Sequence, residues 1–428
     1  MQYKDLDKKT LKGLLDAEYK IFNSYKNLGL SYDMTRGKPC RIQLDLSNEL
    51  ENQKYLKGFS SISDQEVRNY GVLDGIPEAK KLMAEMLGVG TEEIVVGGNS
   101  SLNLMYDLLV RFMLFGTGTE GCRPWVKEEK LKWICLVPGY DRHFLITEKL
   151  GFELIAVPLQ GDGPDMDMVE ELVKDPCVKG IWMIPKYSNP TGEVFSDEKI
   201  RRLAAMETGA KDFRIMCDDA YTVHFLREAP AKQLNMLEAC KEAGNPDRVF
   251  LFCSTSKITF PGSGISAVGA SEKNIKYLLS CLTVQTICYD KVNQLRHARF
   301  LKDYDGIIAH MKKHAEILLP KFEAVNNILA KELGGLGILK WTKPDGGYFI
   351  SIDTLPGCAS AVVAKAKECG VKFTPAGATF PYRQDPNDSN IRIAPTLPPI
   401  QELEAAINIL CVCVKICSME KLLENCEE

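Results

Sequence analysis

Six short apolar runs recur between residues 90 and 270, and longer stretches of mixed character separate them. Almost every residue inside a run is apolar, which is typical of strands buried on both faces of a parallel sheet. Between the runs, 196–210 and 231–243 are predicted to form helices. This alternation predicts an α/β fold with a mostly parallel sheet. The predicted strands are 93–96, 133–137, 153–157, 180–184, 213–217 and 249–253.

The pattern changes after residue 303. Apolar residues recur at helical spacing over 307–329, which predicts one long amphipathic helix. Short strands are predicted within 346–352 and 371–376, and a closing helix over 401–417. We therefore expect a smaller α+β domain, which the first fifty residues join. The predicted divisions are 1–50 (joining the small domain), 51–303 (the large domain) and 304–428 (the small domain).

Composition narrows the class of protein. The 428 residues are too many for one ordinary core, 45% are hydrophobic and 26% are charged, as in a folded soluble protein. The net charge of -4 is spread without a long run of one sign, which argues against nucleic acid or an anionic membrane as partner. The amino terminus lacks an apolar stretch of signal-peptide length. We expect a cytoplasmic protein.

Fifteen cysteines raise the questions of disulfides and metals. Without an export signal, reduced thiols are expected. Cys411, Cys413 and Cys417 cluster late in the chain, but no histidine or CxxC pair accompanies them. A buried helix face explains this cluster better than a metal site, and we predict no metal.

Polar residues follow three of the predicted strands at their carboxyl ends, where open α/β sheets bind ligands. Asn189 lies in a Ser-Asn-Pro-Thr-Gly segment after 180–184, and Asp218 and Tyr221 follow 213–217. Lys257 follows 249–253 after Ser-Thr-Ser. Each motif alone is weak, because Asn-Pro-Thr-Gly is usually a turn and such a lysine is usually exposed.

Together and in this order, these motifs resemble the class-I aminotransferases of the pyridoxal phosphate (PLP)-dependent family, which have the aspartate aminotransferase fold. Further marks are Gly97-Gly-Asn-Ser-Ser101, Pro138-Gly-Tyr140 and Arg392-Ile-Ala-Pro395. The similarity runs from about Thr35 to Pro398. Two motifs resemble those of a bacterial subgroup that includes aspartate aminotransferases: Thr-Arg-Gly-Lys-Pro at 35–39 and Gly-Tyr-Asp-Arg-His-Phe at 139–144. The resemblance implies fold type I of the PLP-dependent transferases.

The resemblance also implies roles for single residues. Lys257 would form the Schiff base with PLP and then move a proton at the substrate Cα. Asp218, rather than its neighbour Asp219, would keep the pyridine nitrogen protonated, because the family pattern places the acid three residues before Tyr221. Tyr221 and Asn189 would hydrogen-bond the ring oxygen, and Tyr140 would stack on the ring.

The cofactor phosphate requires amides at a helix start and hydroxyl groups. The family tyrosine matching Tyr70 reaches the phosphate from a partner subunit, so the resemblance implies a homodimer. One departure from the family is that no arginine occurs between Lys257 and Arg296, where a phosphate-binding arginine is usual. The candidate phosphate residues are Gly98, Asn99, Ser100, Ser101, Ser254, Ser256 and Tyr70.

For the amino-acid and keto-acid substrates, Arg392 matches the arginine that clamps the α-carboxylate with two parallel hydrogen bonds. Gly37 would let the chain approach the same carboxylate. Aspartate with 2-oxoglutarate is the expected pair. Its distal carboxylate needs a further cation, which the sequence does not single out. The candidates are Arg36, Lys38, Arg142 and Arg296.

Three alternatives compete with this interpretation, and the sequence argues against the second and the third. The same fold could act on aromatic or a broad range of amino acids, or as a carbon–sulfur lyase. A transcription regulator with an aminotransferase-like body would need an amino-terminal DNA-binding domain, and too little chain precedes Thr35. A nucleotide-binding protein would need a phosphate loop after a strand, and Gly262-Ser-Gly264 has the wrong continuation.

Overall fold

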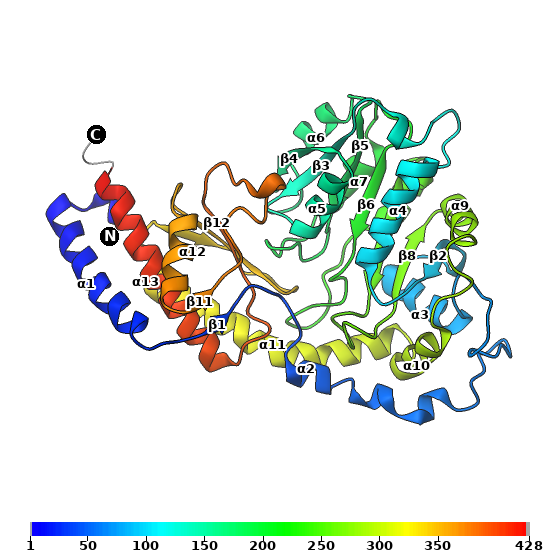
Figure 1. Ribbon diagram of the computed structural model, residues 1–428, viewed down its shortest axis with the longest axis horizontal. Helices are drawn as coiled ribbons and strands as arrows, with labels where there is room; N and C mark the ends of the chain where they lie inside the picture. Colours follow the sequence, from blue (N-terminus) through cyan, green and yellow to red (C-terminus); the bar gives the residue numbers. More distant parts are fainter. Residues whose placement is uncertain (1, 425–428) are drawn as a thin grey trace.

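The computed structural model describes residues 2–424 and contains a seven-stranded sheet in the order β2-β8-β7-β6-β5-β3-β4 (Figure 1). Strands β3 to β7 pair in parallel, whereas β8 is antiparallel to both neighbours, β2 and β7. The predicted α/β fold is confirmed. The strands are β2 (Ile94–Val96), β3 (Lys132–Val137), β4 (Glu153–Pro158), β5 (Val178–Met183), β6 (Arg214–Asp218), β7 (Val249–Ser254) and β8 (Ser266–Ala270).

All six predicted strands are present, within two residues at each end, but the apolar pattern does not predict β8. Its sequence, Ser-Ala-Val-Gly-Ala, contains small residues and no apolar run. It becomes a strand because β2 and β7 flank it on both sides and satisfy its backbone hydrogen bonds. Tertiary pairing, not local propensity, decides this element.

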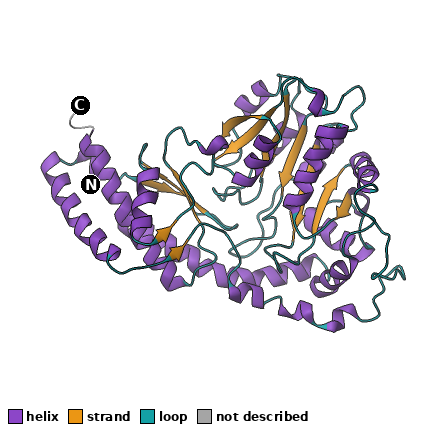
Figure 2. Ribbon diagram, in the orientation of Figure 1, coloured by secondary structure: helices purple, strands orange, loops and turns teal. Residues whose placement is uncertain are grey.

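Helices cover both faces of the sheet (Figure 2). Along β3, Trp133 and Cys135 pack into one apolar cluster, and Ile134 and Leu136 into the other. Because both faces of the sheet are buried, the strand sequences are almost continuously apolar. One cluster includes residues of α4 (Ser101–Phe115), α5 (Asp141–Lys149) and α9 (Glu272–Leu282), and the other includes residues of α3 (Pro77–Leu87), α6 (Met166–Leu172), α7 (Asp197–Ala205) and α8 (Met236–Glu242).

The helices α7 and α8 are shorter than predicted. The side chain of Ser196 caps α7, which ends at Ala205 because Met206 turns to an extended backbone, well before the predicted end at residue 210. Asn235 caps α8 by accepting hydrogen bonds from the amides of Leu237 and Glu238. Capping residues therefore set these boundaries more sharply than apolar spacing does.

The helix α11 (Tyr304–Leu333) is continuous through Pro320 and runs along the base of the molecule to a second group of elements (Figure 1). That group contains an antiparallel sheet of β9 (Leu339–Trp341), β10 (Ile350–Thr354) and β12 (Asn390–Ile393) in the order β12-β10-β9. The predicted strand at 371–376 is only two residues long, β11 (Val371–Lys372). The helices of this group are α12 (Ala359–Glu368) and α13 (Ile400–Glu424).

The amino-terminal segment belongs to the same region. Its strand β1 (Tyr32–Asp33) pairs in parallel with β11, and α1 (Lys8–Lys26) packs beside α13 (Figure 1). The segment then continues through α2 (Arg41–Asp45) towards the large sheet, where α10 (Lys291–Leu301) precedes α11. Within residues 2–424, no helix is long and apolar enough to cross a membrane.

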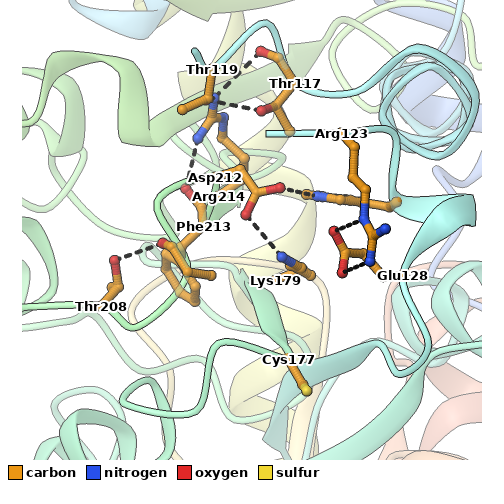
Figure 3. Close-up of polar contacts among 12 residues, drawn as sticks. Thr117, Thr119, Arg123, Glu128, Cys177, Lys179, Thr208, Asp212, Phe213 and Arg214 are labelled. Atoms are coloured by element: carbon orange, nitrogen blue, oxygen red, sulfur yellow. Dashed lines mark hydrogen bonds and ion pairs between the residues drawn. The ribbon is translucent and has the colours of Figure 1, made fainter. Parts of the chain in front are cut away.

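A cluster of buried polar residues lies at the amino-terminal ends of strands β5 and β6 of the large sheet (Figure 3). Lys179 of β5 donates to Asp212 at 3.0 Å, and the Trp125 indole donates to the other carboxylate oxygen at 2.6 Å. Arg214, at the start of β6, donates to the Thr119 hydroxyl at 2.8 Å. These contacts fix the entry into β6, whose opposite end carries Asp218.

Candidate functional site

A cavity of about 560 Å³ opens at the carboxyl ends of the parallel strands. Tyr140 follows β3, Asn189 follows β5, and Asp218 ends β6. Arg392 of β12 and residues 35–39 of the amino-terminal segment close the other side. The chain reverses its direction across the sheet between β3 and β5, which is where such folds place their ligands.

Lys257 lines this cavity, three residues after β7. Its Nζ lies 4.8 Å from the centre of the Tyr221 ring, and its backbone carbonyl accepts a hydrogen bond from the Tyr348 hydroxyl at 3.3 Å. Burial lowers the pKa of the Lys257 amine, while the charge of Asp218 opposes that shift. A depressed pKa increases the fraction of free amine, the form that attacks an aldehyde or accepts a proton.

Asp218 is 3% exposed, and its Oδ2 lies 2.9 Å from Nε2 of His143. The His143 ring stacks on Trp182, with centroids 4.4 Å apart. The other carboxylate oxygen of Asp218 is buried and has no hydrogen-bond partner within the described chain. A buried carboxylate oxygen without a donor is costly, so it marks a place for a ligand that carries an N–H group.

His143 is a site residue that the sequence motifs do not single out. It lies on the first turn of α5, three positions after Tyr140, inside the same Gly-Tyr-Asp-Arg-His-Phe wording. Asp219, by contrast, lines a separate cavity of about 190 Å³ together with Lys186. Burial raises the pKa of Asp219 to about 6, an effect that Lys186 partly offsets.

Two phenols and one amide surround Lys257 and Asp218. Tyr221 is 3% exposed, and burial raises its pKa well above the usual value. Burial together with the charge of Asp218 raises the pKa of Tyr140 to about 12. Both phenols therefore keep their protons and act as donors at neutral pH. The amide oxygen of Asn189 lies 3.4 Å from Arg392.

Arg392 is 7% exposed, and its guanidinium packs over the ring of Phe349 with 4.8 Å between Cζ and the centroid. Its Nη1 donates to Asp141 at 3.2 Å, and its Nε is buried without a partner in the described residues. Gly37 lies against the same ring, because a Cβ there would sit 2.5 Å from the Phe349 Cζ. Only glycine allows this close approach.

The helix α4 begins at the edge of the cavity. Its N-cap Ser100 makes no side-chain cap bond, so the first amides of the helix remain available to a ligand. Ser100, Ser101, Ser254 and Ser256 are among the lining residues.

The other predicted phosphate residues do not line the cavity. The Gly98 carbonyl accepts a hydrogen bond from Ser266, and the Asn99 carbonyl accepts one from Ser256. Asn99 therefore contacts one of the lining serines, Ser256, whereas Gly98 contacts Ser266, which does not line the cavity. Tyr70 is 78% exposed and lies outside the cavity of its own chain. These three assignments remain predictions.

Three of the four candidate cations for a distal carboxylate line the cavity: Arg36, Lys38 and Arg142. Arg296 is not among the lining residues, since it donates to Asn293 at 2.7 Å and to Glu51 at 3.3 Å. Within residues 2–424, no group of three or more histidine, cysteine, aspartate or glutamate side chains is arranged to hold a metal ion. Cys411, Cys413 and Cys417 are buried on α13.

The family model described as aspartate amino-transferase matches residues 6–426. An aspartate aminotransferase of Corynebacterium glutamicum is 47% identical over 399 residues, which cover 93% of this chain and 92% of that protein. A putative aminotransferase of Mycolicibacterium smegmatis is 45% identical and covers 99% of both chains.

Solved structures agree with the sequence comparisons. The crystal structure of an aspartate transaminase from C. glutamicum superposes with a TM-score of 0.96 at 45% identity, covering 99% of both chains. An α-aminoadipate aminotransferase of Thermus thermophilus, complexed with a phosphopyridoxyl-leucine, has a TM-score of 0.73 at 21% identity over 92% of this chain and 94% of that chain, and so shares the fold. The expected resemblance is confirmed: the chain belongs to the aspartate aminotransferase family and is a transaminase of fold type I.

Proposed function

We propose that the protein carries PLP on Lys257 and transfers the amino group of L-aspartate to 2-oxoglutarate. The observation that carries the proposal is the convergence of Lys257, Asp218 and Arg392 on one cavity of about 560 Å³. These residues lie after β7, at the end of β6 and in β12, which are far apart in sequence. The names of the similar proteins from C. glutamicum support aspartate as the donor.

The side chains present fit PLP. The unpartnered Oδ1 of Asp218 suits a protonated ring nitrogen, and the free amides of α4 with Ser100 and Ser101 suit a phosphate. Ser254 and Ser256 would add hydroxyls, and the Asn99 carbonyl accepts a hydrogen bond from Ser256. No residue of 258–272 is a lysine or arginine, so backbone amides, hydroxyls or a cation from elsewhere in the chain would take the place of the missing family arginine.

When bound, PLP supplies an electron sink for the pair of electrons released when the substrate Cα–H bond breaks. The neutral amine of Lys257, favoured by its lowered pKa, would take a proton from the substrate Cα. Asp218 would keep the ring nitrogen of the cofactor protonated, and His143 orients the Asp218 carboxylate. Tyr221 and Asn189 would hold the ring oxygen, and Tyr140 would lie against the ring.

Arg392 binds the α-carboxylate of the substrate, and the chain at Gly37 closes against Phe349 beside it. Arg36, Lys38 and Arg142 provide positive charge for the distal carboxylate. Aminotransfer from aromatic or a broad range of amino acids and carbon–sulfur lysis are the competing activities of this site.

A survey of amino donors tests the substrate. We expect kcat/KM for aspartate with 2-oxoglutarate to exceed that for alanine or phenylalanine by about 100-fold, since a distal ion pair is lost with these donors. Release of pyruvate and thiol from cysteine conjugates at a higher rate than transamination would instead support the lyase.

Lys257→Ala tests the attachment. We expect borohydride to fix the cofactor irreversibly on the wild type and not on the variant, and transamination to fall roughly 10⁴-fold or more. The matched control, Lys273→Ala, removes a largely exposed lysine of α9 that pairs with Asp247. Transamination retained by Lys257→Ala would refute the assignment.

We further infer a homodimer in which Tyr70 reaches the partner's phosphate site. Its 78% exposure and its position outside its own cavity support this. Mixed dimers of Lys257→Ala and Tyr70→Phe chains should contain one fully intact site, whose cofactor affinity equals that of the wild type. An intact site that forms equally in Tyr70→Phe homodimers would contradict the shared arrangement.

The division into 1–50, 51–303 and 304–428 is also proposed, on the support of the β1–β11 pairing and the packing of α1 beside α13. A cytoplasmic location and the absence of nucleic-acid or membrane partners stay predictions.

A further inference from the structure

Arg392 already has a carboxylate partner within its own chain. Its Nη1 lies 3.2 Å from Oδ1 of Asp141, and the two side chains are 8% and 29% exposed. The same Nη1 lies 3.4 Å from the amide oxygen of Asn189. An internal carboxylate therefore contacts the guanidinium that we assign to the substrate α-carboxylate.

This pair spans the cavity. Asp141 is the first residue of α5, directly after Tyr140, whereas Arg392 lies in β12 of the antiparallel sheet. Both residues line the cavity of about 560 Å³. The contact is thus made between two separate groups of elements and not within one helix or strand.

A physical reason for the contact is the burial of the arginine. An isolated buried guanidinium is costly, and its face is covered by Phe349 while its Nε has no partner in residues 2–424. Asp141 supplies the missing negative charge when no substrate is present. Its 29% exposure gives it a route back to solvent when another carboxylate arrives.

Substrate binding and the Asp141 contact compete. A two-bond carboxylate clamp uses neighbouring nitrogens of the guanidinium, and Asp141 engages Nη1. The Nε edge is buried, which leaves the Nη groups for the incoming ligand. A second carboxylate beside Asp141 would also be repelled by it at this distance.

We propose that Asp141 is an affinity-setting residue: it occupies Arg392 in the substrate-free protein and must be displaced by the α-carboxylate of every substrate. The inference rests on the role of Arg392 in the proposed function. Its consequence is that Asp141 raises KM for all carboxylate substrates alike, because the competition occurs at the group that they share. The distal carboxylate plays no part in it.

The test compares Asp141→Asn with the wild-type holoenzyme, using succinate as a probe that binds as a dicarboxylate but has no amino group to transfer. We expect the Kd of succinate to fall about tenfold, since one charge-assisted competitor is removed. KM for aspartate should fall by a similar factor, and the change should lie in KM rather than in kcat. Glu148→Gln is the matched control, because it removes the same charge from an exposed position on the same helix.

Unchanged or weaker succinate binding by Asp141→Asn would overturn the inference, since Asp141 would then orient Arg392 or do nothing to it. Asp141→Ala, which adds no amide, repeats the test if the asparagine variant folds poorly. If Asp141→Asn binds succinate more tightly but the wild type has no transaminase activity, only the proposed function is contradicted. If the wild type is active but Asp141→Asn does not change the Kd of succinate, only this inference is contradicted.

Discussion

Nε2 of His143 lies 2.9 Å from Oδ2 of Asp218, and the two side chains are only 2% and 3% exposed. The imidazole is itself held flat against Trp182, with an interplanar angle of 10°. Because Oδ1 of Asp218 has no partner in the described chain, His143 is the one side chain there that bonds this carboxylate. The Asp218 carboxylate is therefore oriented by a residue that does not itself line the cavity.

His143→Phe is expected to lower kcat about tenfold, because a buried carboxylate loses a hydrogen bond and its orientation. His143→Gln, which can still donate to Asp218, should retain more activity. Steady-state kinetics and the Kd of PLP measure both effects. Equal kcat values for the phenylalanine variant and the wild type would show that Asp218 is oriented without the imidazole.

The two adjacent acids should behave differently. Asp218→Asn is expected to bind PLP but to lower kcat roughly 10³-fold, because a neutral amide does not stabilise the protonated ring nitrogen. Asp219→Asn should change kcat less than about threefold, since Asp219 lines the other cavity with Lys186. Equal losses in the two variants would mean that the wrong acid has been assigned.

The raised pKa of Asp219 predicts that the stability of the folded protein depends on pH. Its pKa is raised from 3.8 to about 6 by burial, so the folded protein binds a proton more tightly than the unfolded chain does. The tighter proton binding by Asp219 stabilises the folded state fully below about pH 4, and this stabilisation is lost as the pH rises through about 6. At pH 8 we expect Asp219→Asn to unfold with a free energy higher than that of the wild type by on the order of 2 kcal/mol.

Chemical denaturation at several pH values measures this difference, which should shrink as the pH falls from about 6 towards about 4. Glu171→Gln is a suitable comparison, because Glu171 is 75% exposed. A constant difference between Asp219→Asn and the wild type over this range would show that the carboxyl does not titrate with the fold.

Disrupting the buried polar cluster at the amino-terminal ends of β5 and β6 is expected to cause a large loss of stability (Figure 3). Asp212→Asn leaves the ammonium of Lys179, which is 6% exposed, without its counter-charge, and should cost about 3–4 kcal/mol. Glu171→Gln breaks the exposed pair with Lys174 and should cost less than about 1 kcal/mol. The denaturant midpoints of the two variants measure both losses of stability, provided that the m-values are unchanged. Equal midpoint shifts for Asp212→Asn and Glu171→Gln would contradict the argument that burial makes the Asp212 contact more costly to break.

Local signals along the chain are sufficient to predict the fold class, and the resemblance to a known family implies many of the residues that line the cavity. Strands β3 to β7 are largely apolar because both faces of the sheet are covered, and the order of Asn189, Asp218, Tyr221 and Lys257 indicates the family. Polar residues placed directly after such strands must meet at one edge of a parallel sheet. Neither conclusion requires knowledge of how distant elements pack.

Relationships between distant residues, by contrast, follow from tertiary packing. The small residues of β8 become a strand through their neighbours, and His143 and Asp141 become partners of Asp218 and Arg392 because α5 packs at the cavity. Packing also separates Asp219 from Asp218 and Arg296 from the lining cations. Such contacts join elements far apart in the chain, and no local pattern of residues encodes the direction in which a side chain finally points.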